Sequence, residues 1–427
     1  MLYRLIYTLL IYLALPVVLY ITYRPQAGKP GYGRRWKELL GWVPPLKAEA
    51  PLWIHTVSVG ESLAAMSLIR QLKAEQPDLP LLVTTTTRTG ADQIARLGDL
   101  VEHRYAPLDY PGAVARFLNR TRPRALVIME TELWPNWLAA CGRRQLPVVV
   151  MNARLSERSC QRYQKVSGVF ASMSRQVSLF LCQHRDDAAR FLRLGVPQSR
   201  VQVTGSLKYD IQLDPEQVSA GEQLRRTLQA RPVWIAASTH PGEDELLLAQ
   251  LPRIRAAHPD SLLILVPRHP ARFEPVAALC QQAGFALARR SRQEPITTDT
   301  AIYLADTMGE MPLLLQMSDL AFMGGSLVPV GGHNLLEPAS LGKPTLIGPH
   351  SFNFADVTHQ LCEQKACRQL ADAEEVAAAV CELLGDAALR QQMGMRAFDV
   401  VAANQGAQRK TLQAILGTLA QAQAQPA

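Results

Sequence analysis

"WIHTVSVGESLAAMSLIRQL", residues 53–72, changes halfway from one periodicity to another. The run up to Val57 is typical of a buried strand, and the apolar residues after Gly60 recur at helical spacing. The stretch therefore predicts a strand that leads directly into a helix, with Glu61 in the first helical turn. An acid at that position either interacts with the helix dipole or carries out chemistry. The dipole lowers the pKa of such a carboxylate, so its strength as a base would have to come from desolvation by a bound ligand.

The same strand-then-helix pattern recurs along the chain in two series. Continuous apolar runs predict buried parallel strands at 80–85, 125–130 and 147–152, and then at 232–239, 261–269, 301–306, 319–325 and 344–349. Amphipathic segments separate the runs, which favours doubly wound α/β sheets. We therefore expect two Rossmann-like domains that face a cleft, a fold of class α/β. The expected boundaries are 25–205 for the first domain, 206–231 for a linker, 232–385 for the second domain and 386–427 for C-terminal helices.

The composition restricts the class of protein. The chain has 427 residues, which suits two domains, and a net charge of +8 that suggests an anionic partner. Among phosphorylated ligands, an acidic membrane surface and nucleic acid, nucleic acid is the least favoured and is not expected, because the arginines are scattered among helices and no base-reading motif is present. The seven cysteines have no CxxC spacing, which indicates free thiols in a reducing compartment.

The N-terminus predicts a membrane anchor over residues 1–24. Leu5 to Tyr23 includes no charged residue and is long enough to cross a hydrocarbon core of about 30 Å as a helix. Five cations follow it without an acidic residue, whereas Arg4 alone precedes it; these cations are Arg24, Lys29, Arg34, Arg35 and Lys37. The asymmetry places the bulk of the protein on the cytoplasmic side of the membrane, against its anionic surface.

In open α/β sheets ligands bind beyond the carboxyl ends of the strands, which selects a set of polar residues as candidates. Glu132 follows the run at 125–130, and Arg268 and His269 end the run at 261–269. An arginine there can bind a phosphate or carboxylate with two hydrogen bonds. Further candidates for the cleft are Ser58, Gly60, Arg154, Ser238, Thr239, His240, Gly325, Ser326, Gly332 and His333.

The stretch 324–350, "GGSLVPVGGHNLLEPASLGKPTLIGPH", is the most informative of these. Its glycines permit tight turns, and "HNLLEP" opens a helix whose N–H groups attract an anion. Asn334 is either the N-cap or a phosphate donor, and Glu337 can accept hydrogen bonds from a ribose diol. The pattern is neither a dinucleotide fingerprint nor a P-loop, which disfavours NAD enzymes and ATPases.

For several residues the sequence leaves two readings open. Lys208 neutralises a leaving group or is a surface cation, and Arg154 is a cleft cation or pairs with Glu157. Glu310 caps a helix or contacts a ligand. Ser238, Thr239 and His240 line phosphate oxygens or cap the helix that begins near Gly242.

Seven motifs appear in order along nearly the whole chain: "SVGE", "ETELWPN", "NARLSERS", "STHPGED", "VPRHPAR", "MGEM" and "GGSLVPVGGHNLLEPASLGKP". Together with the N-terminal anchor, they resemble the Kdo transferases of Gram-negative bacteria. These are inverting glycosyltransferases with two Rossmann domains, the GT-B architecture. The family transfers 3-deoxy-D-manno-octulosonic acid (Kdo) from CMP-Kdo to the lipid A precursor at the inner membrane.

The resemblance implies roles for individual residues. Glu61 falls at the family's general base, and Glu132 and Lys208 at positions that stabilise the transition state. The donor's CMP moiety would be held by Arg268, His269, Gly309, Glu310, Met311, Asn334, Leu335, Leu336 and Glu337. Transfer of two Kdo residues is the commonest behaviour in the family.

No cofactor or metal is expected, because the chain contains no DxD triplet, no HExxH and no clustered His/Cys spacing. Arginine, lysine and a helix N-terminus can hold a carboxylate and a monophosphate without an ion. Three other functions remain: a different glycosyltransferase with a lipid-linked acceptor, a sugar-nucleotide epimerase, and a non-catalytic membrane scaffold. Acceptor-dependent release of CMP from CMP-Kdo separates them.

Overall fold

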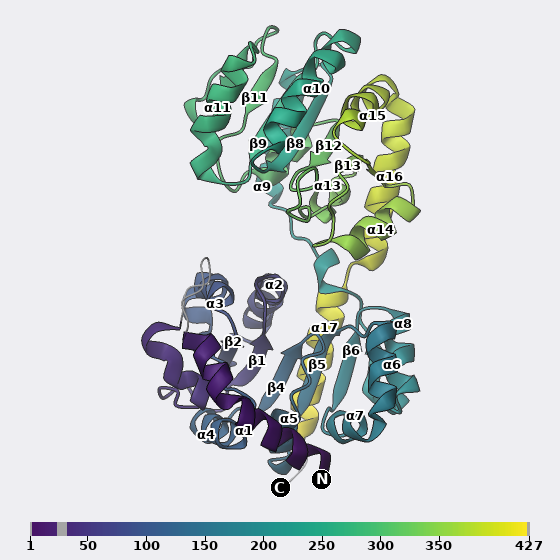
Figure 1. Ribbon diagram of the computed structural model, residues 1–427. Coiled ribbons are helices and arrows are strands. Elements are labelled where there is room, and N and C mark those ends of the chain that lie inside the picture. The colour runs from purple at the N-terminus through teal and green to yellow at the C-terminus, as the bar shows by residue number, and fades with distance from the viewer. Residues whose placement is uncertain (1, 24–31, 425–427) are drawn as a thin grey trace. The chain divides into compact units, whose positions relative to one another are not determined.

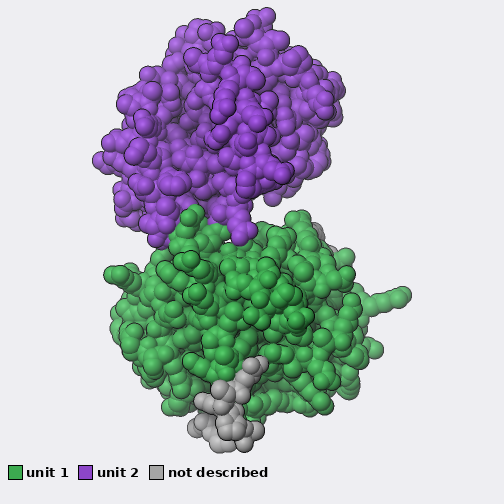
Figure 2. Space-filling model, turned by 180° about the vertical axis from the view of Figure 1, so that it is seen from behind, with its two compact units in different colours: residues 1–210, 405–427 green, residues 211–404 purple. Residues whose placement is uncertain are grey.

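Each of the two series of apolar runs forms one parallel sheet, as predicted, and each sheet gains strands that the runs did not predict, so that each has seven strands. The computed structural model describes residues 2–23 and 32–424. The chain forms two units, one of residues 1–210 and 405–427 and the other of residues 211–404 (Figure 2). The sheet of the first unit has the order β3-β2-β1-β4-β5-β6-β7, and that of the second has the order β10-β11-β9-β8-β12-β13-β14.

The strands of the first sheet are β1 (Leu52–Thr56), β2 (Leu81–Thr85), β3 (Glu102–Tyr105), β4 (Ala125–Met129), β5 (Val148–Ala153), β6 (Leu179–Cys182) and β7 (Val201–Val203). Its helices are α1 (Leu2–Tyr23), α2 (Val59–Glu75), α3 (Arg88–Ile94), α4 (Pro111–Thr121), α5 (Pro135–Arg143), α6 (Glu157–Lys165), α7 (Ser167–Ser174), α8 (Arg185–Arg193) and α17 (Ala407–Ala424).

The strands of the second sheet are β8 (Val233–Thr239), β9 (Leu262–Pro267), β10 (Leu287–Arg289), β11 (Ile302–Leu304), β12 (Leu320–Met323), β13 (Thr345–Ile347) and β14 (Cys367–Gln369). Its helices are α9 (Pro215–Thr227), α10 (Glu243–Ala257), α11 (Phe273–Gln282), α12 (Met311–Met317), α13 (Leu336–Ser340), α14 (Ala355–Glu363), α15 (Glu374–Gly385) and α16 (Ala387–Asn404).

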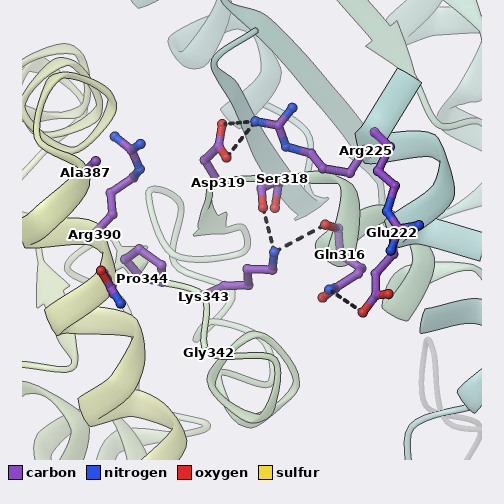
Figure 3. Close-up of a pocket in the computed structure, with 12 residues that line it drawn as sticks. Glu222, Arg225, Gln316, Ser318, Asp319, Gly342, Lys343, Pro344, Ala387 and Arg390 are labelled. Atoms are coloured by element: carbon purple, nitrogen blue, oxygen red, sulfur yellow. Dashed lines mark hydrogen bonds and ion pairs between the residues drawn. The ribbon is translucent and has the colours of Figure 1, made fainter. Parts of the chain in front are cut away.

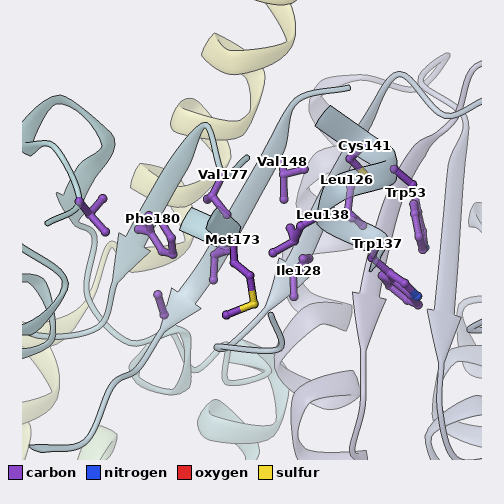
Figure 4. Close-up of a cluster of buried hydrophobic side chains, with 14 of the residues drawn as sticks. Trp53, Leu126, Ile128, Trp137, Leu138, Cys141, Val148, Met173, Val177 and Phe180 are labelled. Carbon is purple, nitrogen blue, oxygen red and sulfur yellow. The ribbon is translucent and has the colours of Figure 1, made fainter. Parts of the chain in front are cut away.

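Successive strand residues enter two different cores, which explains why the runs are continuously apolar. Trp53 of β1 packs against Phe117 of α4 and Trp137 of α5, in a core of the first unit that α7 and α8 also enter (Figure 4). Its neighbours Leu52 and Ile54 point the other way, toward α2 and α17. Because side chains alternate along a strand and helices cover both faces, every position of β1 must be buried.

The C-terminal helix α17 belongs to the first unit. Its buried side chains Leu412, Ile415 and Leu419 pack in the core that contains Leu52 and Val127. Figure 1 shows α17, in yellow, among the elements of the first unit. The segment predicted as C-terminal helices, 386–427, is therefore divided between the units after Asn404. The predicted linker 206–231 also differs from the observed division, which lies after Asp210 and assigns α9 to the second unit.

Helix α1 lies against the first unit. Thr8 Oγ1 donates to Asn136 Oδ1 at 3.2 Å, and the Tyr110 hydroxyl donates to the carbonyl of Ile11 at 2.8 Å. Within the described ranges no helix combines the length and the hydropathy of a membrane span. Arg24 and Lys29, two of the cations behind the predicted topology, fall outside the described residues.

Candidate active site

Glu61 lies where the first sheet reverses its strand order. β1 pairs with β4, and the loops that follow these two strands carry Ser58–Glu61 and Glu130–Glu132. Such a switch point is where doubly wound sheets bind ligands. Ser58 caps α2 by accepting the N–H of Glu61 at 3.2 Å.

The carboxylate of Glu61 is fixed at both oxygens. Oε2 accepts the N–H of Val57 at 2.8 Å, and Oε1 accepts the hydroxyl of Ser58 at 3.0 Å. Each carboxylate oxygen has two lone pairs, so these two bonds leave acceptor capacity for a proton. Glu61 is thus held as a helix-capping acid and can also serve as a base.

Burial raises the pKa of Glu61, and the nearby carboxylates of Glu130 and Glu132 raise it further, whereas the N–H of Val57 lowers it. The pKa of Glu132 is also raised by burial and by Glu130. This corrects the expectation that the helix dipole would leave Glu61 a weak base until a ligand closed over it. Neighbouring negative charge disfavours ionisation of a carboxylate, and this applies to Glu61 and Glu132.

Lys208 is placed by a strained residue of β5. Asn152 has a φ of 52°, and its Oδ1 accepts the N–H of Leu207 at 3.2 Å. Leu207 begins the short 3₁₀ helix Leu207–Tyr209, in which Lys208 is exposed between two buried neighbours. Asn152 lies at the register shift between β5 and β6, so a bulge at a strand end orients the segment with the cation.

Arg154 follows the same strand end and is exposed. Its backbone carbonyl accepts the hydroxyl of Thr131, which joins the β5 loop to the loop of Glu130 and Glu132. Glu157, the alternative partner considered for Arg154, forms ion pairs with Arg190 and Arg193.

In the second unit, three histidines gather at the carboxyl ends of adjacent strands. His240 Nε2 and His333 Nε2 are 2.8 Å apart, with their rings stacked at 13°, and the His269 ring meets His240 edge-on at 5.4 Å. Burial lowers the pKa of His240, and it lowers that of His333 to about 4, with the charge of Arg268 acting in the same direction. The lowered pKa values favour the neutral forms of His240 and His333 beside the exposed Arg268.

Glu243 organises this edge, and the sequence analysis did not identify it as a site residue. Its fully buried carboxylate accepts the N–H groups of Gly325, Ser326 and Leu327 at 2.6–2.9 Å, and that of His240 at 2.9 Å. The carboxylate thus fills a ring of backbone donors in the glycine-rich loop. The only local signal was an acid after "THPG", which also fits an ordinary helix start.

Thr239 and Ser326 lie in the interior instead of lining an open cleft. The Thr239 hydroxyl donates to Asp244 at 2.6 Å, and the Ser326 hydroxyl donates to the carbonyl of Met323 and accepts the N–H of Gly348. Ser238 has a φ of 60° at the register shift between β8 and β9. Gly325 and Gly332 have positive φ, and a Cβ at Gly325 would lie 3.1 Å from the His333 ring.

The polar groups of the segment Asn334–Glu337 bind one another, whereas the sequence predicted that they would hold a ligand. Helix α13 has only five residues, and Asn334 Oδ1 already accepts the N–H of Leu336. Leu335 and Leu336 are buried. Burial raises the pKa of Glu337, and the Asn334 amide and the charge of Arg268 lower it, so Glu337 belongs to the same edge as the histidines.

Gly309 and Glu310 precede α12, which begins at Met311, and the carboxylate of Glu310 already has partners within the fold. Glu310 accepts Arg290 at 2.7 and 3.1 Å and also the Thr307 hydroxyl, and the Arg290 charge holds the pKa of Glu310 below its usual range. Gly309 has a φ of 84°. In the described part of the chain, no group of three or more His, Cys, Asp or Glu residues is arranged to bind a metal.

Comparisons with known proteins identify the same family that the ordered motifs resemble. A family model described as 3-Deoxy-D-manno-octulosonic-acid transferase (kdotransferase) matches residues 34–211. The 3-deoxy-D-manno-octulosonic acid transferase of Haemophilus influenzae is 39% identical over 96% of this chain and 97% of its own length. That of Bordetella pertussis is 37% identical over 87% of this chain and 88% of its own.

Among solved structures, UDP-GlcNAc 2-epimerase from Neisseria meningitidis is similar with a TM-score of 0.53. It is 12% identical and covers 87% of this chain and 100% of its own. A sequence identity of 12% supports a statement about the fold alone. The structural similarity shows that the chain has a GT-B-like α/β fold.

Proposed function

Because the chain belongs to the family of 3-deoxy-D-manno-octulosonic acid (Kdo) transferases, which are glycosyltransferases, we propose that it transfers Kdo from CMP-Kdo to the lipid A precursor. The observation that carries the proposal is the fixed, partly buried carboxylate of Glu61, whose pKa is raised at the switch point of the first sheet. A general base needs both a defined position and a pKa near the working pH.

The proposed reaction follows from the chemistry at the two sheet edges. Glu61 takes the proton of an acceptor hydroxyl, whose oxygen forms a bond to the anomeric carbon of Kdo. The bond from that carbon to the phosphate of CMP breaks, and CMP leaves with the electron pair. Attack opposite the leaving group gives inversion. Lys208 neutralises developing negative charge, and Glu132 stabilises the transition state.

The second unit is proposed to hold the donor. Arg268 can donate two hydrogen bonds to a phosphate or to the carboxylate of Kdo. His240, His269 and His333 form a cluster at the same edge and can donate or accept hydrogen bonds, and Asn334 and Glu337 also lie there. We expect no metal requirement, and we expect two Kdo residues to be added in succession.

The test uses the purified full chain with CMP-Kdo, with and without a tetraacylated lipid A precursor. We expect Glu61→Gln to reduce transfer by about 10²-fold or more, because a general base is lost. Binding of CMP and the melting temperature should stay close to those of the wild type. Both transferred Kdo and released CMP are measured.

The matched control is Glu75→Gln, at the exposed last residue of the same helix α2. It should leave transfer unchanged. Near-normal turnover in Glu61→Gln would remove Glu61 as the base and make Glu132 the next residue to test. CMP release that does not depend on the acceptor would reject the proposed function.

We also propose that residues 1–24 attach the protein to the inner membrane with both units on the cytoplasmic side. The exposed apolar side chains of α1 support this, among them Leu5, Leu9, Leu13 and Val17. A variant that begins at residue 25 should sediment less with anionic vesicles while it still binds CMP. An aggregated variant without CMP binding would contradict the proposal.

A further inference from the structure

The second unit contains a pocket of about 480 Å³ at the amino-terminal ends of β12 and β13 (Figure 3). Ser318 and Asp319 directly precede β12, and Lys343 and Pro344 directly precede β13. The candidate donor residues follow the carboxyl ends of the strands. The pocket therefore lies at the opposite edge of the same sheet and is separate from that site.

Cations outnumber acids in the lining of the pocket. Four cationic residues, Arg225, Arg226, Lys343 and Arg390, face two acidic residues, Glu222 and Asp319. One of these acids is neutralised within the fold, because Arg225 Nη2 contacts both oxygens of Asp319 at 2.9 and 3.1 Å. Asp319 also accepts the N–H of Val233 at 2.8 Å, so this pair holds the start of β8 to β12.

The remaining cations keep donors that the fold does not use. Lys343 Nζ donates to the carbonyls of Gln316 and Ser318, at 3.2 and 2.8 Å, and an ammonium has a third N–H. Arg390 contacts the carbonyls of Leu383 and Leu384 through Nη1 alone. Among the described residues, no hydrogen bond is recorded from Nε or Nη2 of Arg390 or from the guanidinium of Arg226.

The electrostatics of Lys343 agree with an anion-binding role. Burial lowers the pKa of Lys343 to about 8, and the charge of Arg225 acts in the same direction. Carbonyl oxygens solvate the ammonium only in part. An anion in the pocket would stabilise its charged form, and so binding of the anion and protonation of Lys343 favour each other.

The size and lining of the pocket indicate the class of anion. The volume falls in the range of small-molecule sites, roughly 300–1,000 Å³, and it exceeds what a phosphate ion alone requires. No aromatic side chain lines the pocket, so a nucleobase would find no stacking partner. Glu222 and Gln316 offer acceptors for hydroxyl groups. We propose that this pocket binds a phosphorylated sugar or polyol, whose phosphate and hydroxyl groups are contacted by Lys343, Arg226 and Arg390 from different sides of the pocket.

The experiment titrates glucose 6-phosphate and, separately, inorganic phosphate into the full chain by calorimetry. We expect saturable binding of glucose 6-phosphate that is tighter than that of phosphate. Arg226→Gln should weaken it about ten-fold, as expected for the loss of one charge-assisted hydrogen bond. Arg390→Gln should do the same, and because Arg390 also contacts α15, its melting temperature is measured in parallel. The readout needs no Kdo transfer, so it is independent of the proposed function.

The matched control is Arg253→Gln, at an exposed position of α10 in the same unit and outside the pocket. It should bind like the wild type, and saturating CMP should leave binding of glucose 6-phosphate unchanged. Absence of saturable binding at millimolar concentration would overturn the proposal, as would equal weakening by the control or competition by CMP. Equal affinity for inorganic phosphate would overturn the assignment to a sugar or polyol.

The same chemistry occurs in soluble sugar phosphates and in the headgroup of phosphatidylglycerol. Sedimentation with phosphatidylglycerol vesicles, compared with phosphatidylcholine vesicles, separates the two sources. If Arg226→Gln weakens vesicle binding and glucose 6-phosphate competes for it, the ligand is a lipid headgroup. If vesicle binding is unchanged while calorimetric binding is lost, the ligand is soluble.

Discussion

The surroundings of Glu61 have opposite effects on its pKa. As the acid of a helix cap it accepts hydrogen bonds from Val57 and Ser58, which favour the charged form. Burial and the carboxylates of Glu130 and Glu132 favour the neutral form and raise the pKa. A base near two other acids is stronger than an isolated surface glutamate, but it must be deprotonated before it can act.

This balance predicts the pH dependence of transfer. The proposed base works only when ionised, so kcat/KM should fall as the pH falls through the raised pKa of Glu61. Glu130→Gln removes a neighbouring negative charge, so the pKa of Glu61 decreases and the acidic limb of the profile moves to lower pH. The measurement is kcat/KM against pH for both proteins.

Glu75→Gln on the same helix provides the control and should leave the profile in place. An acidic limb that stays unmoved in Glu130→Gln would show that Glu130 does not influence the base. A shift to higher pH would contradict the sign of the argument.

At the level of elements, the strand ends that carry candidate residues share a backbone irregularity. Glu130 follows β4 with a φ of 56°, Asn152 in β5 has 52°, and Ser238 in β8 has 60°. β5 and β8 each have a register shift at that point. Left-handed backbone is uncommon outside glycine, although asparagine tolerates it better than glutamate or serine, and surrounding contacts help to hold it. At Asn152 the hydrogen bond to Leu207 is such a contact.

Asn152→Gly tests how the left-handed backbone of this residue and its hydrogen bond to Leu207 each contribute to stability. Glycine relieves the left-handed backbone but removes the acceptor of the Leu207 N–H, and we expect a net loss of about 1 kcal/mol in the free energy of unfolding. Transfer should fall as well, because the segment of Lys208 loses an anchor. Denaturant unfolding and kcat are the measurements.

The matched variant is Gln145→Gly, at an exposed residue with a φ of 53° in the turn before β5. It relieves the same backbone without breaking a bond to the Lys208 segment, so stability should be unchanged or slightly higher and transfer should be normal. Equal effects of the two variants would rule out a special role for the Asn152 hydrogen bond.

On the scale of the whole molecule, the first unit depends on both ends of the chain. Asp210, its last residue before the second unit, accepts the N–H groups of Gly406 and Gln408 at 2.6 and 2.5 Å. The point where the chain leaves the first unit is thus tied to the point where it returns. Burial of Leu412, Ile415 and Leu419 then fixes α17 on the sheet.

Leu412→Ala should therefore destabilise the first unit selectively. A buried leucine replaced by alanine costs about 2–5 kcal/mol, through lost burial and a cavity. In hydrogen exchange, we expect the amides of β1 and β4 to lose protection while those of β8 and β9 keep theirs. The adjacent exposed substitution Gln413→Ala should change neither set. Equal loss of protection in both units would contradict this assignment of α17.

Features set by residues close together in the sequence could be predicted, and features set by contacts between distant segments could not. Central strands such as β4 and β8 were predicted because both faces are buried, and this leaves a continuous apolar run. The edge strands β3, β7, β10 and β14 were missed, since they have one neighbour each and read "EHRY", "VQV", "LAR" and "CRQ". The interior strand β6, "LFLC", was missed as well, and it has only four residues.

The same limit applies to the site. Glu61 and Arg268 could be selected because their strand ends are local features. The contact between Glu243 and the loop at Gly325–Leu327 joins segments far apart in the sequence. Nothing near Glu243 indicates that its carboxylate is buried. The interior positions of Thr239 and Ser326 escaped the sequence analysis for the same reason.

The return of α17 to the first unit also sets the order in which the protein can mature during synthesis. The strands of this unit leave the ribosome first, but the part of one sheet face that α17 covers stays exposed until residues 407–424 have been made. At roughly 5–20 residues per second, translation of the intervening unit takes on the order of ten seconds or longer. The unit that is synthesised first is thus completed last. Throughout that interval the nascent chain exposes an apolar sheet face that a chaperone could shield.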